Sequence, residues 1–277
     1  MKIKLCGVRG SFQTSDAETK TFGTRTSCTM VVEDGELLIL DAGSGIQHFN
    51  SINFSAKRVD ILLTHLHMDH ILGLGFFSPF FIPEQEVHIW GPKTSSQSLR
   101  TRLSRYLSPP LFPVLLRDLP CNLFFHEIGN AEFEINHFKI KSNYIIHPGP
   151  TIGFRVTGNH SVFTYMPDHE PALGRNGMIR NPKWISGFDI ALNADILYHD
   201  AQYTSEEYQG KKGWGHSSIE DALQYASLCK VKNILLAHHD PAHSDDQLEK
   251  IYLNIKVISE GLTHYEVAKE GNEIDLP

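Results

Sequence analysis

An apolar run passes directly into a cluster of histidines in the stretch Val59-Asp60-Ile61-Leu62-Leu63-Thr64-His65-Leu66-His67-Met68-Asp69-His70. Residues 59–63 are aliphatic or β-branched except for one aspartate, which predicts a short buried strand. Three imidazoles and a carboxylate follow within six positions, which is too short a span for a long helix. A loop at the carboxyl end of the strand can instead turn all four side chains toward one point.

The residue types in this cluster are those of a metal site. His65 and His67 alternate with a leucine, so an extended backbone sends both rings to the same side. Asp69 and His70 come after the turn and can face a second point close by. Histidine nitrogen and carboxylate oxygen suit zinc, and the lack of cysteine in the cluster argues against a closed structural zinc site. We therefore expect two divalent metal ions, with Zn²⁺ favoured and Mn²⁺ or Fe²⁺ as alternatives, rather than a polar loop with chance histidines.

Composition restricts the class of protein. The 277 residues carry a formal net charge of −7, which argues against broad electrostatic attraction to nucleic acid or to an anionic membrane. Arg100, Arg102 and Arg105 are candidates for a local basic patch. The chain lacks the apolar core of a signal peptide and any stretch that could span a bilayer. The cysteines have no metal-binding or redox spacing, so we expect buried thiols and a cytoplasmic protein.

Strands occur in two sets along the chain, and helices follow each set. This order predicts an α/β fold, a four-layer αββα sandwich in which two mixed sheets pack face to face with helices outside. We expect a single domain over residues 1–277. Residues 76–117 are expected to form an excursion over the site, because they contain a dense aromatic run and prolines that fit neither helix nor central strand. We interpret this excursion as a lid or a dimerisation surface, with a plain structural connection as the alternative.

Four further residues of metal-ligand type directly follow apolar runs: His147, Asp168, Asp200 and His238. One such residue would mean little, but four of them downstream of the histidine cluster are hard to explain as solvated strand ends. Asp41 also ends an apolar run, where it either caps the next helix or contacts a ligating histidine.

The HxHxDH motif of residues 65–70 resembles the metal-binding signature of the metallo-β-lactamase superfamily. Further motifs resemble its RNase Z-like branch and, within that branch, proteins described as cyclic-nucleotide-phosphodiesterase-like: Cys6–Ser11, Gly153–Arg155, Pro167–His169, His199–Ala201, Gly215–Ser217 and His238–Pro241. The resemblance extends from Leu5 to about Ile258. One departure is Thr24-Arg25-Thr26, where relatives commonly have an asparagine, and it bears on substrate preference rather than on the metal site.

The resemblance implies how two metal ions would share their ligands. Each ion would have three ligands of its own: His65, His67 and His147 for one, and Asp69, His70 and His238 for the other. Asp168 would bridge them, because a carboxylate can span two cations whereas an imidazole binds one. His239 competes with His238 for the ligand role, and His238 is favoured because it comes first after its strand.

The resemblance also implies a catalytic set of Asp69, His216 and Asp200. Asp200 would orient His216, and His216 would protonate the departing oxygen. Ser217 or Ser218 is placed to cap the helix that follows, so a position in a helix-capping turn is the alternative role for His216.

These parts predict a metal-dependent phosphodiesterase that acts on a small substrate, with a cyclic nucleotide favoured. Two ions about 3.5–4 Å apart would lower the pKa of a bridging water, and the resulting hydroxide would attack phosphorus. Arg155 is a candidate phosphate contact, with a surface strand position as its alternative.

Three other functions remain open: an RNase Z-like nuclease, another ester or thioester hydrolase of the fold, and a metal-stabilised binding or sensor protein. A nuclease is disfavoured because residues 76–117 are too short and too rich in proline for an obvious RNA-gripping arm. We therefore expect no nucleic acid and no membrane as partner, a small phosphodiester as substrate, and a homodimer.

Overall fold

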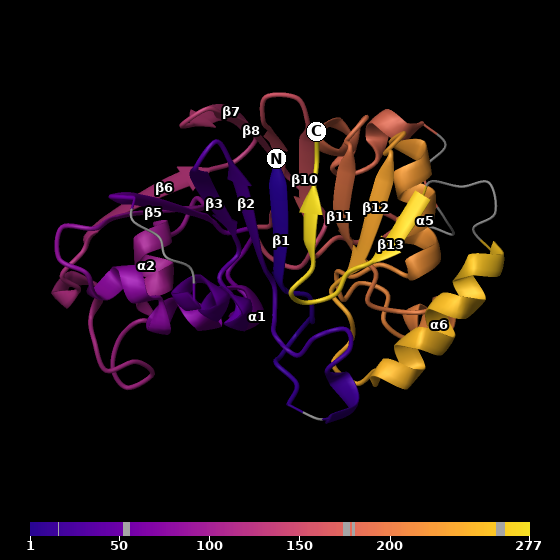
Figure 1. The fold of residues 1–277 in the computed structure, drawn as a ribbon, viewed down its shortest axis with the longest axis horizontal. Coiled ribbons are helices and arrows are strands. Elements are labelled where there is room, and N and C mark those ends of the chain that lie inside the picture. The colour runs from indigo at the N-terminus through magenta and orange to yellow at the C-terminus, as the bar shows by residue number, and fades with distance from the viewer. Residues whose placement is uncertain (16, 52–55, 174–177, 179–180, 259–263) are drawn as a thin grey trace.

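The computed structural model describes residues 1–15, 17–51, 56–173, 178, 181–258 and 264–277. Its described strands form two sheets that pack face to face, and helices lie outside them (Figure 1). This arrangement confirms the predicted sandwich of two mixed sheets with outer helices.

The two sheets have seven described strands each. The first has the order β14 (Glu273–Asp275), β1 (Lys2–Gly7), β2 (Cys28–Glu33), β3 (Glu36–Leu40), β4 (Arg58–Leu62), β5 (Glu86–Pro92), β6 (Asn122–Ile128). The second has the order β13 (His264–Val267), β12 (Asn233–Ala237), β11 (Ile196–Asp200), β10 (Val162–Met166), β9 (Ile152–Thr157), β8 (Phe138–Tyr144), β7 (Ala131–Ile135).

Each sheet is antiparallel in one half and parallel in the other. In the first sheet, β14 to β3 pair antiparallel and β3 to β6 pair parallel. In the second, β7 to β10 pair antiparallel and β10 to β13 pair parallel. The segments that follow β4, β10, β11 and β12 meet at one edge of the sandwich, since their side chains approach one another there. This edge carries the histidine cluster.

The α-helices are α1 (Met68–Ile71), α2 (Leu99–Ser104), α3 (Phe188–Ala191), α4 (Ser205–Gln209), α5 (Ile219–Leu228) and α6 (Asp245–Ile258). Short 3₁₀ helices are η1 (Ala17–Thr19), η2 (Ser44–Ser51), η3 (Leu72–Phe76), η4 (Ser78–Phe81), η5 (Leu116–Asp118) and η6 (Pro182–Trp184). Side chains of α1 and α2 pack on the outer face of the first sheet, and those of α3, α5 and α6 pack on the outer face of the second. Within the described ranges, no helix combines the length and the apolar character needed to cross a bilayer.

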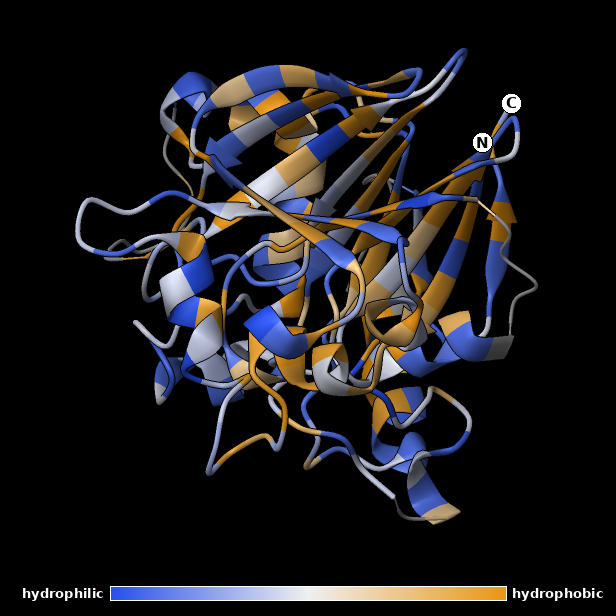
Figure 2. Ribbon diagram, turned by 90° about the vertical axis from the view of Figure 1, so that its left-hand side faces the viewer, coloured by the Kyte–Doolittle hydropathy of each residue, from blue (hydrophilic) through white to orange (hydrophobic). Residues whose placement is uncertain are grey.

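Successive side chains along each strand point to opposite faces of its sheet, so the sequence determines which of them lie between the two sheets. In β3, Leu38 and Leu40 pack between the two sheets, whereas Leu37 and Ile39 pack against the outer helices. Figure 2 shows the corresponding hydrophobic bands along the strands. Full burial of such a side chain stabilises a protein by about 1.5–3 kcal/mol, and slipping a strand by one residue would reverse its faces. The register is therefore well determined, and with it the position of each strand end.

Residues 76–117 do not form one continuous excursion, because β5 within them lies between β4 and β6 in the first sheet. Some of the aromatic side chains in this segment are core, such as Phe77 and Phe80, while Phe76 is 69% exposed. The predicted lid or dimerisation role therefore concerns the remainder, residues 93–117, and stays a proposal.

Helical spacing over residues 95–107 predicts a helix of that length, but the structure has only the shorter α2 there. Ser98 caps α2 by accepting a hydrogen bond from the amide of Thr101 over 3.2 Å. Before it, the hydroxyl of Thr94 donates to the carbonyl of Gln97 over 2.8 Å and closes a turn. Side-chain hydrogen bonds that satisfy the backbone locally compete with further helix, so α2 begins only at Leu99.

Candidate metal centre

The histidine cluster lies where β4 ends. His65 and His67 follow the strand, and their ring centroids lie 4.4 Å apart, on the same side as the alternation predicted. Asp69 and His70 differ from the expectation of a loop, because they belong to α1. The amide of His70 donates to the carbonyl of His67 over 3.0 Å and closes this single helical turn.

Seven side chains from four distant segments converge at this point. They form two groups, and within each group the candidate ligand atoms all lie within 4.8 Å of one another. The groups are His65, His67 and His147, and Asp69, His70, Asp168 and His238. The structure thus brings together all seven residues proposed from the sequence, in the same two sets.

Asp168 lies between the two groups. Its Oδ1 is 3.0 Å from Nε2 of His70, in one group. Its Oδ2 is 3.7 Å from Nε2 of His65 and 3.6 Å from Nε2 of His147, in the other. One carboxylate therefore reaches members of both groups, as a bridging ligand must.

The imidazoles are held through the nitrogen that does not face the cluster. Nδ1 of His70 donates to Oδ2 of Asp41 over 2.8 Å, and Nδ1 of His147 donates to the carbonyl of Gly215 over 2.7 Å. Contacts of this kind fix the tautomer and the orientation of a metal-binding ring. Of the two alternatives for Asp41, the contact to a histidine of the cluster is the one observed.

His238 faces the cluster and His239 does not. Nε2 of His238 lies 3.4 Å from Oδ2 of Asp168, and its Nδ1 lies 3.2 Å from the hydroxyl of Ser27. His239 instead donates from Nε2 to the carbonyl of Ala268 over 2.8 Å. His238 has a φ of 60°, which belongs to the left-handed region. The geometry therefore agrees with the choice of His238.

Several polar atoms at the centre are buried and make no hydrogen bond. They are Nε2 of His65, of His70 and of His238, and Oδ1 of Asp168. Each unpaired buried polar group costs about 1–3 kcal/mol, and native structures rarely contain several at one point. Imidazole nitrogen and carboxylate oxygen are donors that divalent metal ions accept. The residues present therefore fit divalent metal ions.

The protonation states of the buried histidines also suit the binding of divalent metal ions. Burial lowers the pKa of His147 and of His238 to about 4, so both rings are neutral near pH 7, the form that binds a metal. Burial alone would lower the pKa of His70. The carboxylates of Asp168 and Asp69 outweigh this effect and raise the pKa to well above its ordinary value. Carboxylates that hold a proton on His70 would equally attract a divalent cation, which would displace that proton.

The turn at residues 213–216 is shaped to fit against His147. Gly215 has a φ of +92°, and a Cβ at this position would lie 2.3 Å from Nδ1 of His147, so only glycine is accommodated. The buried carboxylate of Glu170 accepts hydrogen bonds from the amides of residues 213 and 215, over 2.8 and 2.7 Å. Glu170 thereby anchors the turn that leads into His216.

His216 lies beside both groups and is held by Asp200, as predicted. Its Nδ1 donates to Oδ2 of Asp200 over 2.7 Å and lies 3.9 Å from Oδ2 of Asp168. Burial lowers the pKa of His216, but the Asp200 carboxylate raises it more, to about 9. The ring is therefore protonated near pH 7. Ser218 caps α5 by accepting from the amide of Asp221 over 3.1 Å, so the cap does not require His216.

Two contacts in the site come from backbone amides that the sequence did not indicate. The amide of Ser11 donates to Oδ2 of Asp69 over 2.9 Å, and the amide of Ser217 donates to Oδ1 of Asp200 over 3.2 Å. Ser11 has a φ of 61°, which belongs to the left-handed region. Every residue has an amide except proline, so no pattern of side chains could have distinguished these two.

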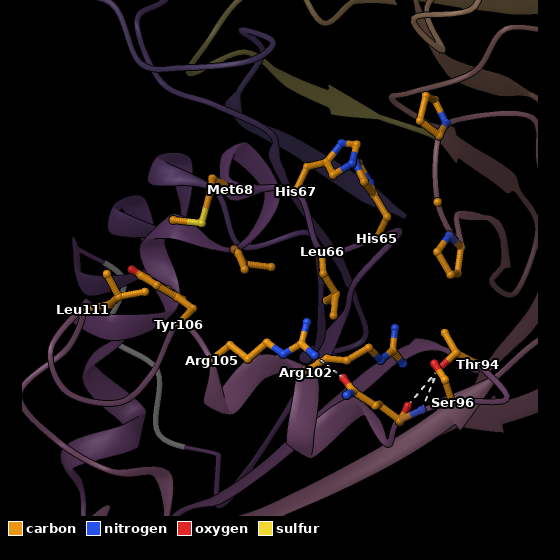
Figure 3. A pocket seen from close by; sticks show the side chains of 15 residues that line it. His65, Leu66, His67, Met68, Thr94, Ser96, Arg102, Arg105, Tyr106 and Leu111 are labelled. Atoms are coloured by element: carbon orange, nitrogen blue, oxygen red, sulfur yellow. Dashed lines mark hydrogen bonds between the residues drawn. The ribbon is translucent and has the colours of Figure 1, made fainter.

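A cavity of about 800 Å³ opens beside the cluster. Its lining includes His65 and His67, part of the segment 93–117, and residues 148–150. Figure 3 shows the two histidines in the upper part of the view and Arg102 and Arg105 in the lower part. Pockets for small molecules have volumes of roughly 300–1,000 Å³, so this cavity can hold a substrate at the candidate metal centre.

Arg155, the other candidate phosphate contact, is engaged elsewhere. Its guanidinium donates to the carbonyls of Ile190 and Leu192 over 3.0 and 2.9 Å, at the end of α3. Arg155 therefore ties β9 to α3 and does not line the cavity beside the cluster.

A family model and a named relative each match most of this chain. The family model described as "Beta-lactamase superfamily domain" matches residues 38–239. "Ribonuclease Z" of Thermococcus gammatolerans is 27% identical over 255 residues, which cover 77% of this chain and 78% of that protein.

Solved structures share the fold over the full chain. Human tRNase Z, short form (ELAC1), has a TM-score of 0.70 at 20% identity and covers 100% of both chains. Unliganded yeast PDE1 has a TM-score of 0.65 at 15% identity and covers 99% of both chains.

Proposed function

The chain belongs to the beta-lactamase superfamily, and on that premise we propose that it is a metal-dependent phosphodiesterase. The observation that carries the proposal is the placement of His216. This protonated imidazole is held by Asp200 and lies 3.9 Å from Asp168, the carboxylate shared by the two groups of candidate ligands. A purely structural or sensory metal site needs no proton donor, whereas departure of an alkoxide from phosphorus does.

We assign the centre two divalent ions, with zinc favoured by the donor set. Asp168 would bridge them, and the remaining ligands would be His65, His67 and His147 for one ion and Asp69, His70 and His238 for the other. When bound, such ions supply an activated water near neutral pH and stabilise negative charge on phosphoryl oxygens.

His216 would give a proton to the leaving oxygen as the bond from phosphorus to that oxygen breaks. Burial raises the pKa of Asp200 to about 6, still below neutrality, so its carboxylate remains ionised and stabilises the imidazolium. Burial also raises the pKa of Asp69, but the neighbouring His70 lowers it more, to below the ordinary range. Asp69 therefore stays ionised, and it can orient the attacking water by accepting its hydrogen bond. A positioned general acid contributes a factor of about 10²–10⁴ to the rate.

A cyclic nucleotide is the substrate class that we favour. The net charge of −7 disfavours broad attraction to a nucleic acid, and the cavity has the volume of a small-molecule site. RNA is the second candidate, because the relative from Thermococcus gammatolerans is named "Ribonuclease Z" and matches 77% of this chain.

We further propose that residues 93–117 cover the bound substrate, since Thr94, Arg105 and Leu111 line the cavity. A homodimer through the same segment stays a prediction. The four cysteines are buried and free, as expected for a cytoplasmic protein, which is the location we propose.

The substrate class is tested by offering the purified, metal-loaded protein cyclic mononucleotides, cyclic dinucleotides, an aryl phosphodiester, a precursor tRNA and a thioester. We expect hydrolysis of the aryl phosphodiester and of at least one cyclic nucleotide. Cleavage of the precursor tRNA without turnover of any cyclic nucleotide would establish the nuclease instead. Turnover of a thioester alone would contradict both.

A further inference from the structure

We propose that Arg102 and Arg105 form a second anion-binding subsite in the cavity beside the metal centre. The substrate would then carry a second phosphate group in addition to the one that is cleaved. This inference rests on the proposed phosphodiesterase function. Among cyclic nucleotides, it selects dinucleotides over mononucleotides.

The cavity has two arginines at one end and candidate metal ligands at the other. His65 and His67, candidate ligands, lie on the same lining as Arg102 and Arg105 (Figure 3). No aspartate or glutamate lines this cavity among the residues that the structure describes. A substrate with one phosphate, placed at the metal ions, would leave the Arg105 guanidinium without an anion. A second phosphate would pair with it, and arginine matches phosphate oxygens through several parallel donors.

Arg102 is fixed in place, and its side chain lines the cavity. One of its terminal nitrogens donates to the carbonyl of Pro92 and lies 3.6 Å from the carboxylate of Glu127. Its Nε is buried and so is closed to a ligand, which leaves the terminal guanidinium nitrogens to face an anion in the cavity.

Arg105 is held at its guanidinium while remaining accessible. Its Nη2 donates to Oε1 of Gln97 over 2.7 Å, and the turn closed by Thr94 fixes Gln97 in turn. The side chain is exposed, so a ligand can reach it without displacing protein. Pre-positioned donors of this kind lose little conformational freedom on binding.

The rest of the lining suits the organic part of a nucleotide. Met68, Leu111 and the ring of Tyr106 give apolar surface on the same lining. The hydroxyl of Tyr106 donates to the carbonyl of Leu72 over 2.7 Å, which fixes the ring. At about 800 Å³ the cavity lies near the upper end of the usual range, which suits a substrate larger than a mononucleotide.

Arg100, on α2, provides a matched control for Arg105, the residue that directly follows this helix. Its guanidinium carbon lies 5.8 Å from the ring centroid of Phe125, and its side chain lines a different, smaller cavity. Arg100→Gln and Arg105→Gln therefore remove the same charge from neighbouring exposed positions, and only the second touches the proposed subsite.

The decisive experiment is a binding measurement on the metal-loaded protein by calorimetry. The ligands are adenosine 3′,5′-bisphosphate and the two corresponding monophosphates, none of which contains a diester to cleave. We expect the bisphosphate to bind at least about tenfold more tightly than either monophosphate, since one charged hydrogen bond contributes about 1.5–3 kcal/mol. Arg105→Gln should abolish that preference and Arg100→Gln should preserve it. Equal affinity for all three ligands, or equal loss in both variants, would overturn the inference.

A kinetic comparison separates this inference from the proposed function. For a cyclic dinucleotide, Arg105→Gln should raise KM about tenfold with kcat unchanged, whereas a cyclic mononucleotide should show less than a twofold change. If the wild-type protein cleaves no diester yet prefers the bisphosphate through Arg105, the subsite stands and the phosphodiesterase function fails. If it cleaves both substrates and Arg105→Gln affects them equally, the function stands and the subsite fails.

Discussion

Replacing Asp168 with alanine is expected to remove bound metal and activity together. Asp168 reaches both groups of candidate ligands, with contacts of 3.0 Å to His70 and 3.6 Å to His147. Removal of this carboxylate would leave the two cations close together without the anion that separates them. Loss of metal-ion catalysis amounts to several kcal/mol in the barrier, or more than about a thousandfold in rate.

Metal content by elemental analysis and turnover of an aryl phosphodiester check this prediction on the same samples. The wild-type protein should contain close to two ions per chain, one for each of the two groups of candidate ligands. His67→Ala should also lose metal and activity, because it removes a candidate ligand of the other group. Asp118→Ala is the matched control, since Asp118 is an exposed aspartate outside the site. An Asp168→Ala protein that is fully loaded and active would disprove the bridging assignment.

Replacing His216 with alanine is expected to preserve both metal ions while turnover falls by about two to four orders of magnitude. His216 also forms a third candidate group with His147 and Asp168, but its Nδ1 is already engaged by Asp200, so we expect it to act as a proton donor and not as a ligand. If the ring donates a proton, the loss depends on the leaving group. An aryl ester that releases a stabilised phenolate should lose little, whereas a natural alkoxide leaving group should show the full deficit.

The pH dependence gives a second measure of the same role. Because the pKa of His216 is raised to about 9, the ring is protonated below that value and loses its proton above it. The turnover number for an alkoxide leaving group should therefore fall as pH rises toward about 9, and bound cations would move this fall to lower pH. His216→Ala should lack that fall. Equal losses on both leaving groups would instead show that His216 positions phosphate or supports the fold.

The sequence predicted the residues of the candidate metal centre because they occupy positions that the sheets bring together. His65 and His67 follow a strand with an unambiguous apolar pattern, and Asp168 and His238 follow two others. Once two sheets with outer helices were expected, these strand ends could only meet at an edge. Residue type then restricted the choice, since imidazole and carboxylate groups rarely converge without a ligand.

The parts that the sequence did not reveal depend on backbone geometry and on packing at a distance. The backbone amide of Ser11 donates a hydrogen bond to Asp69. The carboxylate of Glu170 accepts hydrogen bonds from amides of a turn more than forty positions away. The strands β13 and β14 were not predicted, because their side chains alternate only between exposed and half-buried and so give little apolar signal.

The structure of the segment 76–117 also depends on packing that the sequence did not reveal. Its prolines and aromatics indicated an irregular covering segment, but the pairing of β5 with β4 and β6 is a property of the whole sheet. Arg102 and Arg105 were recognised as part of a basic patch. Their position on the lining shared with His65 and His67 became apparent only from the cavity.

The central claim is that this chain is a metal-dependent phosphodiesterase. Its most direct test is hydrolysis of an aryl phosphodiester while divalent metal is returned stepwise to protein stripped by a chelator. We predict no turnover without metal, a rise with added Zn²⁺ or Mn²⁺, and a plateau near two equivalents per chain. Full turnover by protein shown to be free of metal, or none by protein that holds two ions per chain, would contradict the claim.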